Sequence, residues 1–445
     1  MNYPLPEAFI ARMRAQLGPH ADAYFSALEA PYLRGVRLNP RKAVHAEKVE
    51  GIGDAVPWNA PMGHYLSMDS AAGLDPLHEA GAYYIQEPSA MAPVTLLNLE
   101  SGMRVLDLCA APGGKSTQIA DRLGTEGLLV CNEPVPGRAK ILSRNIERMG
   151  VGNALVVSAD PEKLAPLWPN AFDAILVDAP CSGEGMFRRH PETRAEWSES
   201  APEGCAERQK RILACAVRML RPGGSLVYST CTLNREENEN VVSWLLDTFP
   251  ELETVPFSLS IGEGKTLEAP DGMAHLYPHE LKGEGHFTAK LQKAKGEADN
   301  LFLPAAERLG KPQKPLLEAW RAFAKPFGSL PEANAQFGDM LISAPKLPPL
   351  KGIKVLRAGI QLGTLKGRVF APDHALAMAL PTPYALPTIA LTREEALRYQ
   401  SGETLSCADG LSGYVLPVYE ELALGFAKCS GGQMKNHYPK GLRRP

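Results

Sequence analysis

The stretch Val105-Leu-Asp-Leu-Cys-Ala-Ala-Pro-Gly-Gly-Lys115 has the pattern of a buried strand, a glycine turn and the beginning of a helix. Further apolar runs follow it along the chain, with helical segments between them. Continuous apolar strands that alternate with helices indicate a parallel sheet covered by helices on both faces. We therefore predict an α/β fold built on a doubly wound, Rossmann-like sheet.

Five strands and four helices are predicted for this sheet. The expected strands are 104–109, 128–133, 154–160, 172–179 and 225–231, and the expected helices are 116–123, 138–149, 203–220 and 237–249. A further strand over 283–291 is expected to close the sheet, with an antiparallel orientation as one option.

The segments outside the sheet have a different character. The N-terminal part is predicted to be mostly helical, and a helix over 6–17 places Phe9, Ile10, Met13 and Leu17 on one face. The polar run 293–300 marks a linker, and the chain beyond it is rich in proline and short strands. We therefore expect four domains, at 1–95, 96–292, 301–372 and 375–445.

The composition is that of an ordinary globular protein. Of the 445 residues, 44% are apolar and 22% are charged. No run approaches the roughly 20 consecutive apolar residues of a membrane span, and the first residues lack the features of a signal peptide. Eight cysteines without a CxxC pair favour neither a disulfide framework nor a zinc site. We expect a cytoplasmic monomer with no membrane partner and no metal.

Two acid-free stretches carry clusters of basic residues, although the net charge of the chain is −3. One stretch lies between Asp339 and Asp373, and the other follows Glu421. Such clusters are candidate contacts for RNA phosphates, but they can equally be solvated basic faces. The residues are Lys346, Lys351, Lys354, Arg357, Lys366 and Arg368 in the first stretch, and Lys428, Lys435, Lys440, Arg443 and Arg444 in the second.

Acidic residues stand at or near the ends of the first three predicted strands: Asp107, Glu133 and Asp160. Ligands of doubly wound sheets bind at the carboxyl ends of the strands, and an acid ending the second strand is the expected partner of ribose hydroxyls. The glycine turn matches neither GxGxxG nor GxxxxGK[ST], which disfavours phosphate binding. The pattern predicts S-adenosylmethionine as cofactor, with Asp160 facing the adenine. The alternative is that the three acids only cap helices or turns.

Two cysteines follow neighbouring strands of the predicted sheet. Cys181 lies in Asp178-Ala-Pro-Cys-Ser-Gly-Glu-Gly185, after the fourth strand, and Cys231 lies in Ser229-Thr-Cys-Thr232, at the end of the fifth. Because these strands are neighbours in this topology, the two thiols should lie close together. Cys407 and Cys429 carry no signal. The remaining cysteines are predicted to be packing residues: Cys109, Cys131, Cys205 and Cys215.

A pair of thiols beside a methyl donor suits methyl transfer to carbon 5 of a pyrimidine. Carbon 5 of cytosine is a poor nucleophile. When a thiolate adds to carbon 6, the ring becomes an enamine, and its carbon 5 can then attack the methyl group of the donor. Asp178 could hydrogen-bond ring N3, and a second thiol could assist elimination. Enzymes that methylate an exocyclic amine carry an aromatic residue where this chain has Cys181, which argues against that reaction. These residues alone do not rank the two thiols.

Several longer motifs resemble the RsmF-like branch of the Sun-type RNA (cytosine-5) methyltransferases. They are Tyr83-Tyr-Ile-Gln-Glu-Pro-Ser-Ala90, Ala110-Ala-Pro-Gly-Gly-Lys115, Asp178-Ala-Pro-Cys-Ser-Gly-Glu-Gly-Met-Phe187, Tyr228-Ser-Thr-Cys-Thr232, Glu236-Glu-Asn-Glu239, Tyr277-Pro-His279 and Gly283-Glu-Gly-His-Phe287. The resemblance is strong over 1–292 and weaker in the tail.

This resemblance implies a class I methyltransferase sheet, a PUA-like RNA-binding domain at the C-terminus and S-adenosylmethionine as methyl donor. The implied reaction is methylation of cytosine C5 in RNA, with small-subunit (16S) ribosomal RNA or the small ribosomal subunit as the expected partner. Two alternatives stay open: a transfer RNA (cytosine-5) methyltransferase, and a non-catalytic RNA-binding factor of ribosome assembly.

The resemblance also implies roles for individual residues. Cys231 becomes the nucleophile, Cys181 promotes release of the product, and Asp178 completes the catalytic set. Lys115 is expected to touch the cofactor or the target base, and Arg37-Leu-Asn39 resembles a short element of the family's RNA-contacting part. The implied cofactor-binding residues are Cys109, Ala110, Ala111, Pro112, Gly113, Gly114, Lys115, Glu133, Arg138, Asp160 and Asp178.

Overall fold

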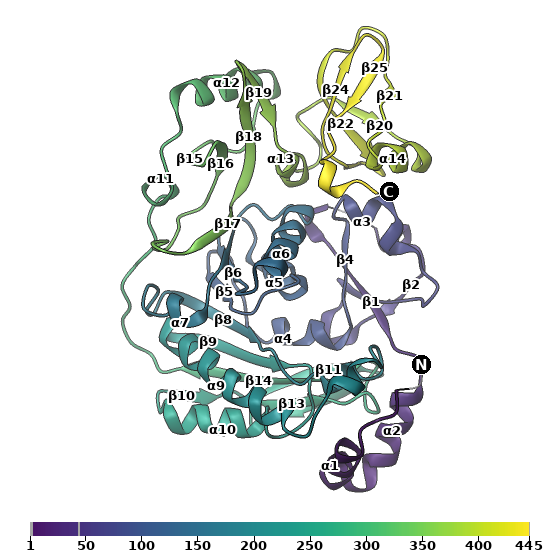
Figure 1. Ribbon diagram of the computed structural model, residues 1–445, viewed down its shortest axis with the longest axis vertical. Coiled ribbons are helices and arrows are strands. Elements are labelled where there is room, and N and C mark those ends of the chain that lie inside the picture. Colours follow the sequence, from purple (N-terminus) through teal and green to yellow (C-terminus); the bar gives the residue numbers. More distant parts are fainter. Residues whose placement is uncertain (1–2, 43–44, 445) are drawn as a thin grey trace.

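A nine-stranded sheet forms the centre of the computed structural model, which describes residues 3–42 and 45–444 (Figure 1). Five parallel strands run in the spatial order β7–β6–β5–β8–β9. The strand β14 pairs with β9 in the antiparallel orientation, which was one of the options that the sequence left open. This order confirms the doubly wound α/β fold. The bounds are β5 (Arg104–Asp107), β6 (Leu128–Asn132), β7 (Ala154–Ser158), β8 (Phe172–Asp178), β9 (Leu220–Thr230), β10 (Leu252–Thr254), β13 (Met273–Leu276), β14 (His286–Lys293) and β17 (Lys354–Ala358).

Helices cover both faces of this sheet because successive side chains of each buried strand point to opposite faces. On β6, Leu129 and Cys131 pack into an apolar cluster with one pair of helices, while Leu128 and Val130 pack into a second cluster with the other pair. The first pair is α5 (Gly114–Leu123) and α6 (Pro136–Arg148), and the second is α9 (Ala201–Met219) and α10 (Glu239–Thr248). The short helices α4 (Ala92–Thr95), α7 (Pro161–Leu164) and α8 (Thr193–Glu196) and the hairpin β11 (Phe257–Gly262)–β12 (Lys265–Ala269) complete the domain.

The prediction that residues 1–95 are mostly helical missed a four-stranded sheet in this part. After helices α1 (Glu7–Leu17) and α2 (Ala21–Glu29) the chain forms an antiparallel sheet in the order β2–β3–β1–β4, with α3 (Pro76–Glu79) between β3 and β4 in the chain. These strands have only three to five residues each, too few for a clear period-two pattern in the sequence. Their bounds are β1 (Arg34–Leu38), β2 (Ile52–Ala55), β3 (Gly63–Leu66) and β4 (Tyr83–Ile85).

Arg37 and Asn39 join this N-terminal sheet to the central domain. Arg37 is 1% exposed, forms an ion pair with Asp121 of α5 and donates a hydrogen bond of 2.6 Å to Oγ1 of Thr117. The Asn39 amide donates to the carbonyl oxygens of Gly81 at 2.8 Å and Met149 at 3.0 Å. Both side chains are buried between two parts of the protein, so neither is exposed for a contact with RNA, and the expectation that the element lies in the RNA-contacting part stays a prediction.

After the linker the chain returns to the central sheet. β17 pairs antiparallel with β7, and its residue Arg357 is buried and forms an ion pair with Glu147 of α6. Arg357 is therefore not part of a phosphate-contacting surface. The remaining elements of this region are α11 (Ala305–Arg308), α12 (Lys314–Ala324), β15 (Ala335–Phe337), β16 (Met340–Ser343), β18 (Ile360–Lys366), β19 (Val369–Pro372) and α13 (His374–Ala379).

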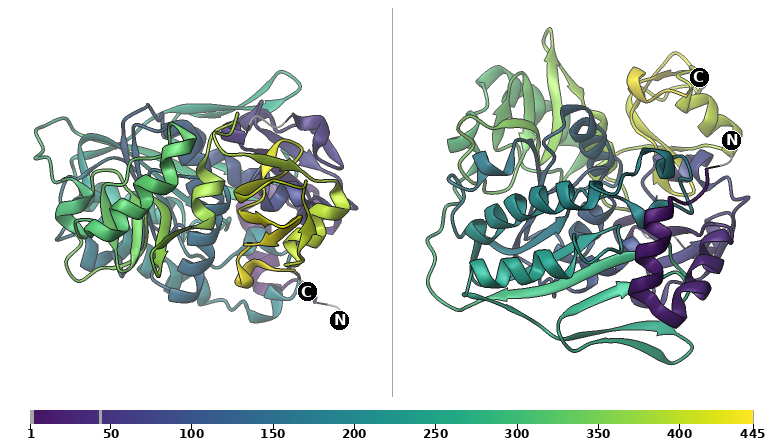
Figure 2. Two further views of the ribbon diagram at one scale, coloured as in Figure 1. Left: turned by 90° about the horizontal axis from the view of Figure 1, so that it is seen from above. Right: turned by 60° about the horizontal axis from the view of Figure 1, so that its bottom comes forward.

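The C-terminal unit is a small β structure that sits beside the β15–β19 region, above the central sheet (Figures 1 and 2). An apolar cluster that includes Trp320, Phe370 and Phe426 joins the two. None of the described helices combines the length and the apolar character needed to cross a membrane. The elements are β20 (Thr388–Ala390), α14 (Arg393–Gln400), β21 (Leu405–Ser406), β22 (Gly413–Tyr419), β23 (Leu422–Ala423), β24 (Ala427–Ser430) and β25 (Gln433–Asn436).

Candidate active site

A cavity of about 500 Å³ opens at the carboxyl ends of the five parallel strands. Each strand contributes a lining residue at its end or just beyond it, which is where doubly wound sheets bind ligands. From β5, β6, β7, β8 and β9 in turn, these are Cys109, Glu133, Asp160, Asp178 and Cys231. Ala111, Arg138 and Cys181 also line the cavity, so it collects most of the predicted site residues.

The glycine turn between β5 and α5 forms one wall. Gly113 has a φ of 117°, a backbone conformation that favours glycine, and α5 begins at the next residue. The turn is held by two contacts: the backbone N–H of Ala110 donates to the Asn132 carbonyl at 2.9 Å, and Arg138 donates to the Ala111 carbonyl at 3.0 Å. Ala110, Pro112, Gly114 and Lys115 support this wall without lining the cavity.

The three strand-end acids have different environments. Glu133 is buried, accepts the backbone N–H of Val135 at 3.0 Å and forms an ion pair with Arg138 at 3.1 Å. Asp160 lines the cavity and also caps α7, so capping does not remove it from the predicted cofactor site. Asp107 lies behind the cavity wall, and burial raises the pKa of its carboxyl to about 7. Only two of these three acids can therefore contact a ligand in the cavity.

The two thiols lie in contact, as the strand order predicts. The Sγ atoms of Cys181 and Cys231 are 3.3 Å apart, and both cysteines are free and partly exposed. The hydrogen bond to Cys231, together with burial, holds the pKa of the Cys181 thiol well above its usual range. Cys131 and Cys215 are buried, in keeping with a packing role, whereas Cys109 lines the cavity, so packing alone does not describe it.

Asp178 is fixed by three side chains. Lys115 donates to Oδ2 at 2.8 Å, Ser229 donates to Oδ1 at 2.8 Å, and Nε2 of His286 lies 3.5 Å from Oδ1. Desolvation acts to raise the pKa of Asp178, but the charges of Lys115 and His286 outweigh it and hold the pKa well below its usual range. Asp178 is therefore an ionised hydrogen-bond acceptor beside the thiols.

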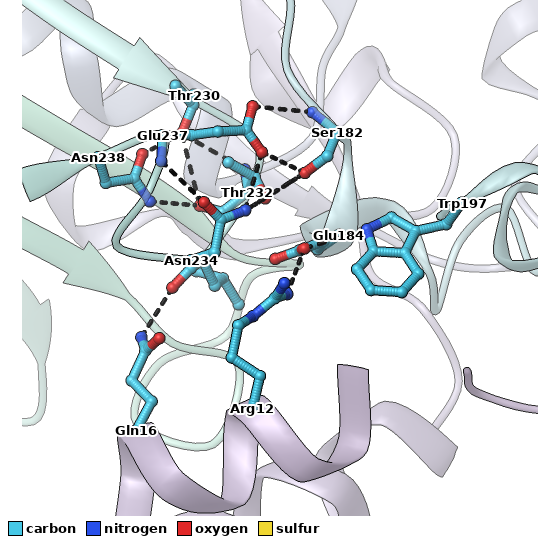
Figure 3. Close-up of polar contacts among 11 residues, drawn as sticks. Arg12, Gln16, Ser182, Glu184, Trp197, Thr230, Thr232, Asn234, Glu237 and Asn238 are labelled. Carbon is cyan, nitrogen blue, oxygen red and sulfur yellow. Dashed lines mark hydrogen bonds and ion pairs between the residues drawn. The ribbon is translucent and has the colours of Figure 1, made fainter. Parts of the chain in front are cut away.

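A buried polar network joins the first cysteine loop (179–187) to the second cysteine loop (231–238), as Figure 3 shows. Ser182 contacts Thr232 at 2.9 Å through their hydroxyls. The Glu237 carboxylate accepts the backbone N–H of Ser182 at 3.0 Å and the amides of Asn234 and Gln209, both at 2.8 Å. This network fixes the separation of the two loops on the side away from α1.

Sequence reasoning missed several residues of this site. His286 and Glu237 fall inside motifs that were recognised, but neither motif by itself indicates a contact with Asp178 or with the first cysteine loop. Arg208 and Arg211 of α9 line the cavity mouth, and their spacing of three residues within a predicted helix was the only available signal. Arg211 approaches Glu162 to 3.9 Å across this mouth.

Comparison with known proteins agrees with this architecture along the whole chain. The family model for the 16S rRNA methyltransferases RsmB/F matches residues 94–292, and the model for the N-terminal domain of 16S rRNA methyltransferase RsmF matches 5–88. The models for the RsmF first C-terminal domain and the RsmF PUA domain match 321–380 and 386–444. Ribosomal RNA small subunit methyltransferase F of Klebsiella pneumoniae is 34% identical, over 99% of this chain and 96% of its own. The chain belongs to the RsmF family.

Other relatives agree with this assignment. The RsmF protein of an Escherichia coli O127:H6 strain is 33% identical over 99% of this chain and 96% of its own. A solved methyltransferase homologue from Pyrococcus horikoshii is 32% identical, with a TM-score of 0.55, and the match covers 65% of this chain and 95% of that one. The RsmF resemblance inferred from the motifs, the fold class and the C-terminal PUA domain are thus confirmed.

RsmF enzymes are methyltransferases whose methyl donor is S-adenosylmethionine, and the cavity fits this molecule. Its volume of about 500 Å³ lies within the range of small-molecule sites. The carboxylates of Glu133 and Asp160 line the cavity, and they can accept hydrogen bonds from ribose hydroxyls and the adenine amine. The glycine turn offers backbone groups rather than a phosphate cradle, which suits a ligand without phosphate.

Proposed function

We propose that this protein methylates carbon 5 of a cytosine in small-subunit (16S) ribosomal RNA through a covalent bond between Cys231 and carbon 6. The observation that carries the proposal is the 3.3 Å contact between the Cys181 and Cys231 sulfurs, in the cavity that Asp178 also lines. A cysteine that only packs in the core does not need a second thiol beside it. A pair at the ends of neighbouring strands suits a reaction that both forms and breaks a bond to sulfur.

The roles of the two thiols are those that the family resemblance implies, with Cys231 as the nucleophile and Cys181 as the thiol that promotes release. The hydrogen bond to Cys231 and burial raise the pKa of Cys181, which is compatible with a thiol that does not itself attack the ring. In the last step carbon 5 loses its proton to a solvent base, the bond between carbon 6 and sulfur breaks, and Cys231 leaves as a thiolate; Cys181, in contact with that sulfur, promotes this release. When bound, S-adenosylmethionine supplies an electrophilic methyl group.

Asp178 acts on the ring during this addition. Because its pKa is held low, the carboxylate stays ionised and can accept a hydrogen bond from N3–H of the adduct. Lys115 and Ser229 keep the carboxylate in place, and each is itself held by a secondary-structure element, α5 or β9. The ring must leave its stack to reach these groups, so the target is a single-stranded or flipped cytosine.

The names of the curated relatives and the PUA domain match support RNA of the small ribosomal subunit as the substrate. We include in the proposal that the protein acts as a monomer and that it works in the cytoplasm, beside its ribosomal substrate.

The experiment that tests this function supplies methyl-labelled S-adenosylmethionine and unmodified small-subunit RNA, both naked and as assembled subunits. The RNA is then digested and the labelled nucleoside identified. Labelled 5-methylcytidine is the expected product. Label on another nucleoside would refute the cytosine chemistry, and label in transfer RNA but in neither ribosomal form would refute the ribosomal substrate.

A further inference from the structure

One face of helix α1 contacts both cysteine loops (Figure 3). Arg12 forms an ion pair with Glu184 of the first cysteine loop. Gln16 donates a hydrogen bond of 2.7 Å to the Leu233 carbonyl of the second cysteine loop, and a further one of 2.9 Å is formed with the Tyr277 hydroxyl. Residues four apart share a helix face, so Arg12 and Gln16 each hold one loop from the same side.

Apolar side chains complete the contact between α1 and the loops. Phe9 and Met13 of α1 pack in one buried cluster with Phe187 of the first cysteine loop and Leu233 of the second. The rings of Phe9 and Phe187 meet edge to face, with centroids 5.0 Å apart. The helix therefore packs against both loops, and this packing fixes the orientation of the polar side chains Arg12 and Gln16 toward them.

The contact at Glu184 leads directly to the nucleophilic loop. The carboxylate is 0% exposed, and besides Arg12 it accepts the indole N–H of Trp197 at 3.1 Å. A buried carboxylate is strongly unfavourable unless it is paired, so Arg12 determines where Glu184 can lie. The next residue, Gly185, donates its backbone N–H to the carbonyl oxygen of Cys231 at 2.9 Å. A shift of Glu184 therefore moves a contact made by Cys231 itself.

We propose that Arg12 and Gln16 are positioning residues that hold the sulfurs of Cys181 and Cys231 in contact for the reaction. The proposal rests on the function proposed above, in which one thiol bonds to RNA and the other promotes release. Misplacement of reacting groups by about 1 Å can lower a rate roughly 100-fold. The Glu237 network supports the loops on one side, and α1 supports them on another.

Substitutions in α1 test this, with Arg14→Ala as the matched control. Arg14 lies on the same helix, and its ion pair with Asp22 is exposed to solvent. Gln16→Ala and Arg12→Ala are each expected to lower kcat about ten-fold and to change the KM for RNA less than about two-fold. Arg12→Lys should recover part of the loss, and Arg14→Ala should behave as wild type. Wild-type kcat in both test variants, or an equal loss in the control, would overturn the proposal.

A second readout reports the thiol separation without methyl transfer. Diamide joins two neighbouring thiols: both lose their protons, an S–S bond forms, and the two electrons and two protons reduce the N=N bond to a hydrazine. Peptide mapping gives the rate of the Cys181–Cys231 crosslink, expected to fall about ten-fold in Gln16→Ala and Arg12→Ala only. An unchanged rate overturns the positioning role. A slowed rate in a protein that never methylates cytosine supports it and refutes only the proposed function.

Loss of folding is separated from loss of positioning by a double variant. Arg12→Ala leaves the Glu184 carboxylate buried without its cation, and a folding defect could follow. Arg12→Ala combined with Glu184→Gln removes that charge. We expect the double variant to regain thermal stability while kcat and the crosslinking rate stay low. Recovery of kcat together with stability would overturn the proposal.

Discussion

Lys115 donates a hydrogen bond of 2.8 Å to Asp178, and Asp178 lines the cavity that contains both thiols. The pair links the helix after the glycine turn to the end of β8. Since the Lys115 ammonium helps to hold the pKa of Asp178 low, the carboxylate is charged when the target base arrives. The glycine-turn wall of the cavity and the carboxylate proposed to act on the target base are therefore one connected unit.

Asp178→Asn keeps the shape of this side chain and removes its charge. We expect kcat to fall about 100-fold or more, because the amide cannot stabilise positive charge at N3 and leaves Lys115 without its anion. Single-turnover methylation at saturating RNA and donor measures the effect. An Asn variant with wild-type kcat would contradict the role given to this carboxylate.

Asp107 makes the stability of the protein depend on pH. Its pKa is about 7 in the folded protein, compared with about 3.9 in an unfolded chain. Between these values the unfolded state loses the proton and the folded state keeps it, so the free energy of unfolding falls as pH rises from about 4 to about 7 and then levels off. Asp107→Asn has no titrating carboxyl group at this position, so it should lack this contribution to the pH dependence.

Denaturant unfolding at about pH 5 and about pH 8 tests this contribution. The wild-type protein should lose roughly 3 kcal/mol more between these two pH values than Asp107→Asn does. The comparison removes the contributions of other titrating groups, which both proteins share. Parallel pH profiles for the two proteins would show that Asp107 does not titrate in this range.

Gly185 of the first cysteine loop packs closely against the backbone of Cys231 and of Gly285. A Cβ atom there would lie 2.7 Å from the carbonyl oxygen of Gly285 and 2.9 Å from that of Cys231, too close for either backbone group. Gly185→Ala should therefore separate the loops and lower kcat more than about ten-fold. Gly204→Ala is the control, because its helix position has no atom within 4 Å of the new Cβ and alanine favours helix. Equal activity in both variants would argue against the tight loop contact.

Substitution of Arg37 distinguishes a structural role of its ion pair with Asp121 from a contact between Arg37 and RNA. Removal of one partner of a buried ion pair destabilises a protein by about 3–5 kcal/mol. Arg37→Ala should therefore lower the free energy of unfolding by this order, while the folded variant keeps its affinity for RNA. Denaturant unfolding and RNA binding on the same preparation give both values. Normal stability with weakened RNA binding would instead indicate that Arg37 contacts RNA.

The central sheet was predictable because its parallel strands are apolar on both faces. Leu128–Asn132 is such a strand, and the topology places it beside β5 without further information. The strands of the N-terminal sheet are short and pair across turns, so their order depends on packing that no local pattern records. The pairing of β17 with β7 joins strands that lie much further apart in the sequence, so no local pattern indicates it either.

The sequence predicted the site residues that follow the ends of the parallel strands. It did not predict the contacts that other segments make with the two cysteine loops. Cys181 and Cys231 meet because they end neighbouring strands. The contact between Arg12 and Glu184 joins residues 172 positions apart, and neither residue type indicates a partner. The sequence also placed Asp107 with the ligand-facing acids, whereas its carboxylate is buried, accepts a hydrogen bond from Ser116 and does not line the cavity.

The most direct test of the account compares Cys181→Ala and Cys231→Ala on unmodified small-subunit RNA with S-adenosylmethionine. Denaturing gels and intact mass reveal any covalent protein–RNA species. We predict that Cys181→Ala accumulates this adduct, because release is blocked after the bond has formed, and that Cys231→Ala forms neither adduct nor methylated RNA. Adduct in Cys231→Ala, with none in Cys181→Ala, would contradict the assignment of the nucleophile.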